Sequence, residues 1–175
     1  MPSQQEWVRA FAKQAKADFD AWTTLQDVSN AAPEGASQLP RCQKLHFLQM
    51  AFEKLAKAHL LEGGSRLADL KQSHAYIARN IPLIVWGQMN LEGASKRAAN
   101  AARQSSKRIA REIELLSPSV NDGGKREDNC EYPWEEGGFV RVPAEWTFPN
   151  LNILTEPAAR NILKRVRTAI ERLAS

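Results

Sequence analysis

Apolar residues recur at steps of three and four over about five stretches of the chain, which is the pattern of amphipathic α-helices. The first predicted helix runs from about Gln4 to Ser29, and a loop rich in helix-breaking residues follows it. The second begins near Leu39-Pro40 and ends at Gly63-Gly64, where glycine can close a helix in the left-handed conformation. Its wide apolar arc predicts a central position, and its narrow polar strip consists of His46, Gln49, Glu53 and Lys57.

Three more helices are expected in the rest of the chain. One starts after Ser65 as its N-cap, and Pro82 should end or kink it, because proline disfavours the α conformation of the preceding residue. The next runs from about Asn90 to Leu116 and has a side of small residues that permits close packing. The last begins at the signal Thr155-Glu156-Pro157. One core is expected to contain the following apolar residues: Phe11, Phe19, Trp22, Leu48, Phe52, Leu55, Ile77 and Val166.

A long irregular segment, from Ser119 to Leu154, precedes the last helix. Gly137-Gly138 lies between two aromatic runs within it, which predicts a short β-hairpin. Large aromatic side chains need a place to bury, so we expect Trp134, Phe139 and Trp146 to anchor this segment.

These elements predict an all-α fold, an up-and-down bundle of about five helices with a long loop and a short hairpin before the last helix. The chain has 175 residues, of which 43% are hydrophobic and 25% charged; these proportions exclude wholesale disorder. The length predicts one domain over residues 1–175, with an irregular insertion at about 119–154.

Cys42 and Cys130 are too few for a disulfide framework and lie in no metal-binding motif, so we expect reduced thiols. The first residues lack the pattern of a signal peptide. The most apolar run, Ile81 to Gly87, is far shorter than the roughly 20 residues that span a bilayer. We therefore expect a cytoplasmic protein without membrane contact.

The net charge is only +4, yet two predicted helices each carry a basic face. On the Asn90–Leu116 helix the basic residues fall within an arc of about 140°. The two faces together are a candidate surface for nucleic acid, formed by Lys96, Arg97, Arg103, Lys107, Arg108, Arg111, Arg160, Lys164 and Arg167. The other interpretation is a pair of solvated helix surfaces without a partner.

The three histidines differ in their predicted surroundings. His59 and His74 fall in apolar stripes, which predicts buried, hydrogen-bonded core residues. His46 lies on the polar strip of the second helix and is therefore the candidate for acid–base chemistry. Arg41 precedes it by five positions, about 140° away on a helix, so the two would meet only in a site completed by other elements or another protomer. A chance spacing is the alternative.

Other chemistry-bearing motifs are missing from the sequence. It contains no phosphate-binding glycine loop, no nucleophile elbow and no metal-spaced set of His and Cys residues. We therefore expect no metal and no cofactor.

The segment HFLQMAFEKLAKAHLLEGG, residues 46–64, resembles the HEPN superfamily, and so does LADLKQSHAYIARNIP, residues 67–82. The first is similar to the apolar family helix with a Gln, an Ala-x-Glu-Lys centre and a Leu-rich end before glycines. The second is similar to the following family segment, in which a histidine opens a helix. The matching residues of the first segment are Gln49, Ala51, Glu53, Lys54, Ala56, Lys57, Leu60 and Leu61.

The resemblance implies an up-and-down helical bundle that dimerises. Many family members are metal-independent ribonucleases of toxin–antitoxin, defence or RNA-processing systems. Their signature is an Arg followed four to six residues later by a His, in a cleft shared by two protomers. The matching spacing here is Arg41 to His46, at the start of the second helix, earlier in the bundle than in the catalytic members. Other members are binding or scaffold modules, sometimes paired with a nucleotidyltransferase chain.

Two functions are therefore expected. The first is a HEPN-like homodimer that binds RNA or nucleotide phosphates and acts as a metal-independent ribonuclease of a toxin–antitoxin or defence system. In it His46 would be the general acid or base, Arg41 would stabilise negative charge, and the 2′-hydroxyl would be the nucleophile. The alternative is a non-catalytic protein-interaction module, a scaffold or an antitoxin partner.

Overall fold

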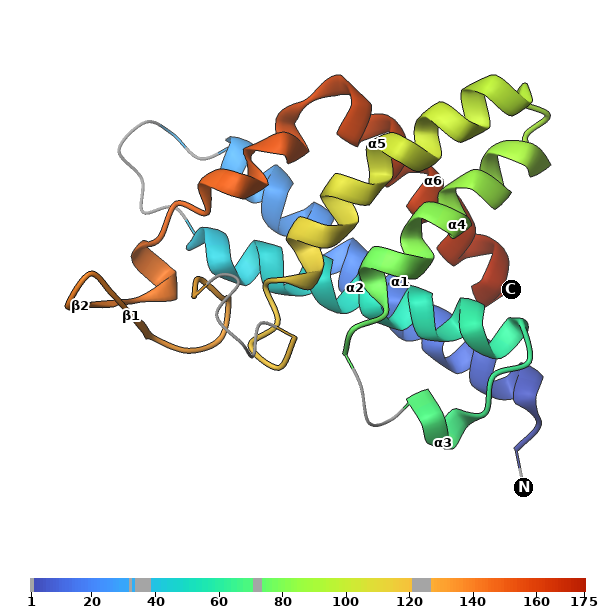
Figure 1. Ribbon diagram of the computed structural model, residues 1–175, viewed down its shortest axis with the longest axis horizontal. Coiled ribbons are helices and arrows are strands. Elements are labelled where there is room, and N and C mark those ends of the chain that lie inside the picture. Colours follow the sequence, from blue (N-terminus) through green and yellow to red (C-terminus); the bar gives the residue numbers. More distant parts are fainter. Residues whose placement is uncertain (1, 32, 34–38, 71–73, 121–126) are drawn as a thin grey trace.

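The fold is an assembly of five long helices, seen here in a computed structural model that describes residues 2–31, 33, 39–70, 74–120 and 127–175 (Figure 1). A single-turn helix, α3, accompanies them. The helices are α1 (Gln4–Ala31), α2 (Arg41–Glu62), α3 (Leu67–Leu70), α4 (Ile77–Leu91), α5 (Lys96–Glu114) and α6 (Pro157–Ala174). The predicted all-α class is confirmed.

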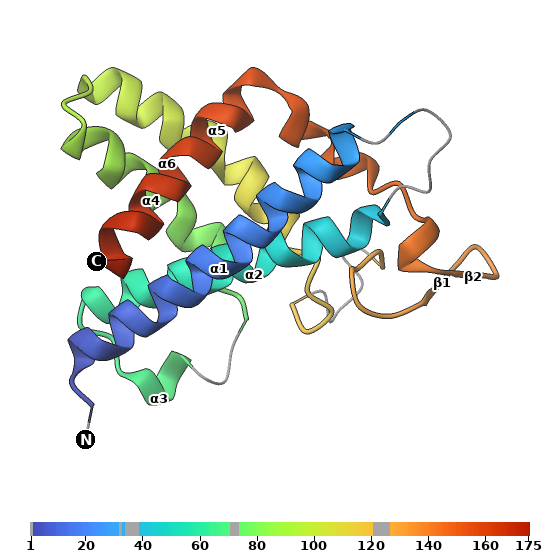
Figure 2. The same cartoon turned by 180° about the vertical axis from the view of Figure 1, so that it is seen from behind.

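The helices pack as two pairs joined by the last helix. α1 lies along α2, and α4 and α5 form a second antiparallel pair. α6 crosses behind α4 and α5 in the view of Figure 1 and also packs against α1; seen from behind, α6 and α1 lie in front (Figure 2). α2 therefore contacts each of the other long helices, as its wide apolar arc predicts.

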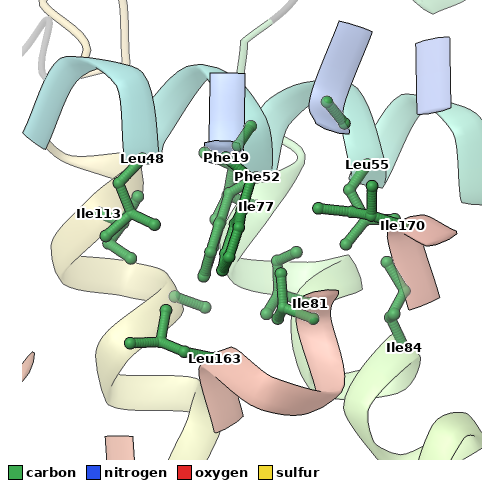
Figure 3. Close-up of a cluster of buried hydrophobic side chains, with 14 of the residues drawn as sticks. Phe19, Leu48, Phe52, Leu55, Ile77, Ile81, Ile84, Ile113, Leu163 and Ile170 are labelled. Atoms are coloured by element: carbon green, nitrogen blue, oxygen red, sulfur yellow. The ribbon is translucent and has the colours of Figure 1, made fainter. Parts of the chain in front are cut away.

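One hydrophobic core fills the space between these helices (Figure 3). Phe52 of α2 lies at its centre, fully buried, next to Phe19 of α1 and Ile77 of α4. The predicted core is confirmed, with Phe11 and Trp22 packed at its margin rather than fully buried. Phe52→Ala would cost about 3–5 kcal/mol at such a position.

The helix predicted to follow Ser65 and to end near Pro82 is wrong in its bounds. The chain instead forms the short α3, and α4 begins at Ile77 and continues through Pro82. Proline in a helix interior costs about 3 kcal/mol, because one hydrogen bond is lost and the ring crowds the previous turn. The burial of Ile77, Ile81 and Val85 on one face of α4 offsets this cost.

The helix predicted from Asn90 starts later. α4 continues to Leu91, and Gly93 forms the turn with a φ of 75°. Ser95 then caps α5, since its hydroxyl accepts a hydrogen bond from the Ala98 N–H at 3.2 Å. The Ser cap was a stronger start signal than the apolar periodicity.

The predicted hairpin is confirmed. β1 (Trp134–Glu136) pairs antiparallel with β2 (Phe139–Arg141), with Glu136 opposite Phe139 across the glycine turn. Two 3₁₀ helices, η1 (Pro143–Glu145) and η2 (Pro149–Thr155), lead to α6.

The anchors of this segment were predicted only in part. Trp134 and Trp146 are half-buried and meet edge to face with ring centroids 5.6 Å apart. Phe139, however, is 67% exposed at the hairpin tip, and Phe148 is the fully buried aromatic residue. A short hairpin presents its tip to solvent, so the aromatic residue nearest the bundle becomes the anchor.

Candidate active site

The polar strip of α2 is the starting point of the site. His46, Gln49, Glu53 and Lys57 follow one another at steps of three and four on one side of a helix that is otherwise apolar and packed. Gln49, Glu53 and Lys57 are only 1%, 4% and 7% exposed. The charged groups of Glu53 and Lys57 require partners at such burial, because removing a charge from water costs several kcal/mol.

Glu53 receives two such partners. One carboxylate oxygen lies 2.7 Å from Lys57 Nζ, and the other lies 3.0 Å from His74 Nδ1. Since an ionised carboxylate only accepts hydrogen bonds, His74 Nδ1 carries the proton. Nε2 of His74 is then the ring nitrogen left for a substrate.

His74 is therefore not the buried core residue that the sequence predicts. Its side chain is 47% exposed. The helical periodicity that placed it among apolar residues does not apply, because it lies in the non-helical stretch before α4. This stretch directs the ring to Glu53 of α2.

His46 and His74 line the same pocket, which has a volume of about 430 Å³. Ser117 and Ser119, just beyond α5, form part of its wall, and their hydroxyl oxygens lie 2.9 Å apart. Glu131 and Tyr132, from the segment before β1, complete it. The pocket thus combines two imidazoles, a buried carboxylate and hydroxyl groups from parts of the chain that are distant in sequence.

Two residues that line this pocket each have a side-chain polar atom that is buried without a hydrogen-bond partner in the described chain. The atoms are His46 Nδ1 and Gln49 Oε1, which lie one turn apart on α2. Buried polar atoms nearly always have a partner, so an unpaired one beside a pocket is a place where a water molecule or a ligand would supply it.

Arg41 does not contribute to this pocket. Its guanidinium donates hydrogen bonds to the Thr147 carbonyl and to Asn152 Oδ1, and burial lowers its pKa. It fastens the start of α2 to the segment around η2. Within this chain, the structure does not bring Arg41 and His46 into one site.

His59 lies near the other end of α2, in a different environment. Its side chain is 34% exposed, so it is half-buried rather than a buried core residue. Burial lowers its pKa, against the opposite effect of Glu62 nearby, and Arg172 lowers it further. It borders a separate groove along α4 and has no part in the pocket of His46.

The basic residues of α5 remain largely available. Arg111 pairs with Glu114 of the same helix at 3.1 Å, and the Glu114 carboxylate also accepts the Ala78 N–H of α4. Arg103 is half-buried. The α5 residues that are exposed and have no ion pair within the described chain are Lys96, Arg97, Lys107 and Arg108.

The basic residues of α6 are used differently. Arg165 pairs with Glu92, Arg167 with Asp20 and Arg172 with Glu62, at 3.3, 3.6 and 2.9 Å. Arg160 and Lys164, in the first half of the helix, are exposed and unpaired among the residues with described positions.

Sequence reasoning found the strip on α2 but missed most of the residues opposite it. His74, Ser117, Glu131 and Tyr132 come from connecting segments, where no periodicity indicates direction. A signal was nevertheless present, because four polar residues on one side of a highly apolar helix require partners or a ligand.

No group of three or more metal-ligating side chains occurs within the described ranges, and no helix there is long and apolar enough to cross a bilayer. Comparison with family models, curated proteins and solved structures finds no match to this chain.

Proposed function

We propose that this protein is a HEPN-like RNA-binding module that cleaves RNA without a metal ion. The observation that carries the proposal is the shared pocket of His46 and His74, with the buried Glu53 holding one of the two rings. Two positioned imidazoles supply the base and the acid that transfer of a phosphodiester to a neighbouring hydroxyl requires.

The two histidines have different roles in this proposal. His46 has no charged partner among the described residues, and it removes the proton from the 2′-hydroxyl. The 2′-oxygen attacks phosphorus, and the bond to the 5′-oxygen breaks. His74 gives its proton to that leaving oxygen, and Glu53 compensates the positive charge of the ring. The products are a 2′,3′-cyclic phosphate and a free 5′-hydroxyl.

The free cations of α5 support RNA as the substrate. α5 contains 19 residues and is about 28 Å long, and the pocket residues Ser117 and Ser119 follow its end. A strand that lies along Arg97, Lys107 and Arg108 is therefore led toward the histidines. Phosphate contacts of this type fix position and carry no sequence information.

The wider setting follows from the resemblance alone. It suggests a homodimer in the cytoplasm, a role in a toxin–antitoxin or defence system, and a nucleotidyltransferase chain as a partner. A dimer would also give Arg41 a second protomer to face.

Cleavage of a labelled RNA in EDTA, with its 2′-deoxy counterpart as control, tests the proposal. The wild type should cut only the RNA, and His46→Ala and His74→Ala should each slow cleavage roughly 10²–10⁴-fold. His59→Ala, a histidine outside the pocket, is the matched control and should cut at the wild-type rate. Cleavage of the deoxy strand, or unimpaired cleavage by either pocket variant, would contradict the proposal.

A separate feature favours the non-catalytic alternative. A groove of about 640 Å³ runs beside α4, lined by Leu83, Trp86 and Leu91, and Leu91 is 69% exposed. Apolar surface of this kind is typical of protein interaction sites. A wild type that binds RNA or a protein but never cleaves would favour this role.

A further inference from the structure

The pocket contains more hydrogen-bond acceptors than the acid–base chemistry uses. Gln49 lines the pocket and is 1% exposed, and its Oε1 is buried without a donor from the described chain. Glu131, an exposed residue of the segment before β1, also lines the pocket and offers its carboxylate. A ligand that brings adjacent N–H groups would satisfy both.

The wall that carries Glu131 is held in a fixed conformation. Asn129 is buried, and its Oδ1 accepts the backbone N–H groups of Glu131 and Tyr132 at 2.9 and 2.7 Å. This Asx-type turn sets the direction of both residues without using their side chains. Within the described chain neither side chain has a hydrogen-bond or ion-pair partner, so both can bind a ligand.

Tyr132 supplies the apolar part of the wall. It is 62% exposed although it is a large aromatic residue, and it lines the pocket. Aromatic side chains in such positions stack on unpaired nucleobases, which are then read by hydrogen bonds along their edges. A volume of about 430 Å³ is in the range of small-ligand sites.

We propose, as an extension that rests on the proposed function, that this pocket is a base-recognition subsite that selects guanine. Guanine presents N1–H and the 2-amino group side by side, which matches the acceptors of Glu131 and Gln49. Adenine and cytosine place a ring acceptor beside the amino group, and uracil flanks its single N–H with two carbonyls. Each of these three bases would therefore place one of its own acceptors against the acceptor of Glu131 or Gln49, which is repulsive.

Equilibrium binding of GMP, IMP, AMP and UMP to the full chain tests the subsite directly. GMP should bind most tightly, and IMP, which lacks only the 2-amino group, should bind roughly tenfold more weakly, as expected for the loss of a hydrogen bond to a charged acceptor. Glu131→Gln and Gln49→Met should each reduce the ratio between GMP and IMP. Tyr132→Phe should retain binding, whereas Tyr132→Ser should weaken all four nucleotides.

Controls separate this inference from the proposed function. Glu131 is exposed, so its variant should fold even where Gln49→Met does not. His74→Ala should keep the guanine preference and lose cleavage. Guanine-selective binding by a wild type that never cleaves would support the subsite and overturn the ribonuclease. Cleavage with equal affinity for all four nucleotides, or a preference that both variants leave unchanged, would overturn the subsite.

Discussion

α5 and α6 are both amphipathic helices rich in basic residues, and they differ in the partners of those residues. Each carries a basic face, yet on α6 three arginines form ion pairs with Glu92, Asp20 and Glu62 of other elements. On α5 no such pair to another element is found within the described chain, and its Arg111 pairs with a neighbour one turn away.

The difference teaches that a basic helix face is a surface for a ligand only where the fold leaves its charge uncompensated. The α6 arginines connect α6 to α1, α2 and the turn after α4. Each partly exposed pair contributes about 0.2–1 kcal/mol to stability and little net charge to the surface. Among the described residues the α5 cations form no ion pair with another element, so their positive charge remains uncompensated at the surface.

The largest effect should come from removing the free charges of α5. We expect the triple variant Arg97→Gln, Lys107→Gln, Arg108→Gln to bind single-stranded RNA much more weakly, with the salt slope of binding reduced by up to about 0.7 for each lost phosphate contact. Thermal unfolding should be almost unchanged. Binding titrations at several salt concentrations measure the slope. An unaltered slope would mean that the basic face of α5 is solvated and does not contact RNA.

The matched variant on α6 should show the reverse pattern. Arg165→Gln, Arg167→Gln and Arg172→Gln together should lower the free energy of unfolding by about 1–2 kcal/mol, because three ion pairs between elements are lost. RNA affinity should stay near that of the wild type. Urea unfolding measures the loss of stability. A variant with wild-type stability and weaker RNA binding would mean that the α6 arginines bind RNA instead of stabilising the fold.

A smaller effect concerns His59, which lies beside the Arg172–Glu62 pair. Burial lowers the pKa of His59 below its ordinary value of 6.5, so on acidification the unfolded chain takes up the proton first. The contribution of neutral His59 to the free energy of unfolding is complete above about pH 6.5. It is lost as the pH falls toward the pKa of His59 in the folded state.

His59→Gln should therefore remove a small part of the acid sensitivity. The difference in unfolding free energy between wild type and His59→Gln should shrink between about pH 7.5 and about pH 5.5. A difference that stays constant over this range would mean that the side chain is solvated in the folded protein.

Much of the fold was predictable because strong local signals agreed with tertiary packing. The apolar stripes of α1, α2 and α6 became buried faces, and Gly137-Gly138 became the turn between β1 and β2. Pro82 shows where local rules fail, since burial of a helix face outweighed the cost of the proline. Phe139 and Phe148 show that aromatic content does not reveal which residue turns inward.

The candidate site was predictable on one wall only. His46 and Glu53 were expected on a polar strip, because helical spacing fixes which side chains share a face. His74 was placed in the core, since the sequence does not reveal that the chain leaves the helical path before α4. Arg41 was expected to meet His46 only in a site completed by other elements or another protomer, and within this chain its guanidinium bonds to Thr147 and Asn152.

The most direct test of the central claim, that His46 and His74 act in one chemical step, is a double-mutant cycle in single-turnover RNA cleavage with EDTA present. The cycle compares the wild type, His46→Ala, His74→Ala and the double variant. Two groups that act together in one transition state are strongly non-additive, so the double variant should be hardly slower than the slower single variant. A double variant whose loss equals the product of the two single losses, or that still cleaves like the wild type, would contradict the shared site.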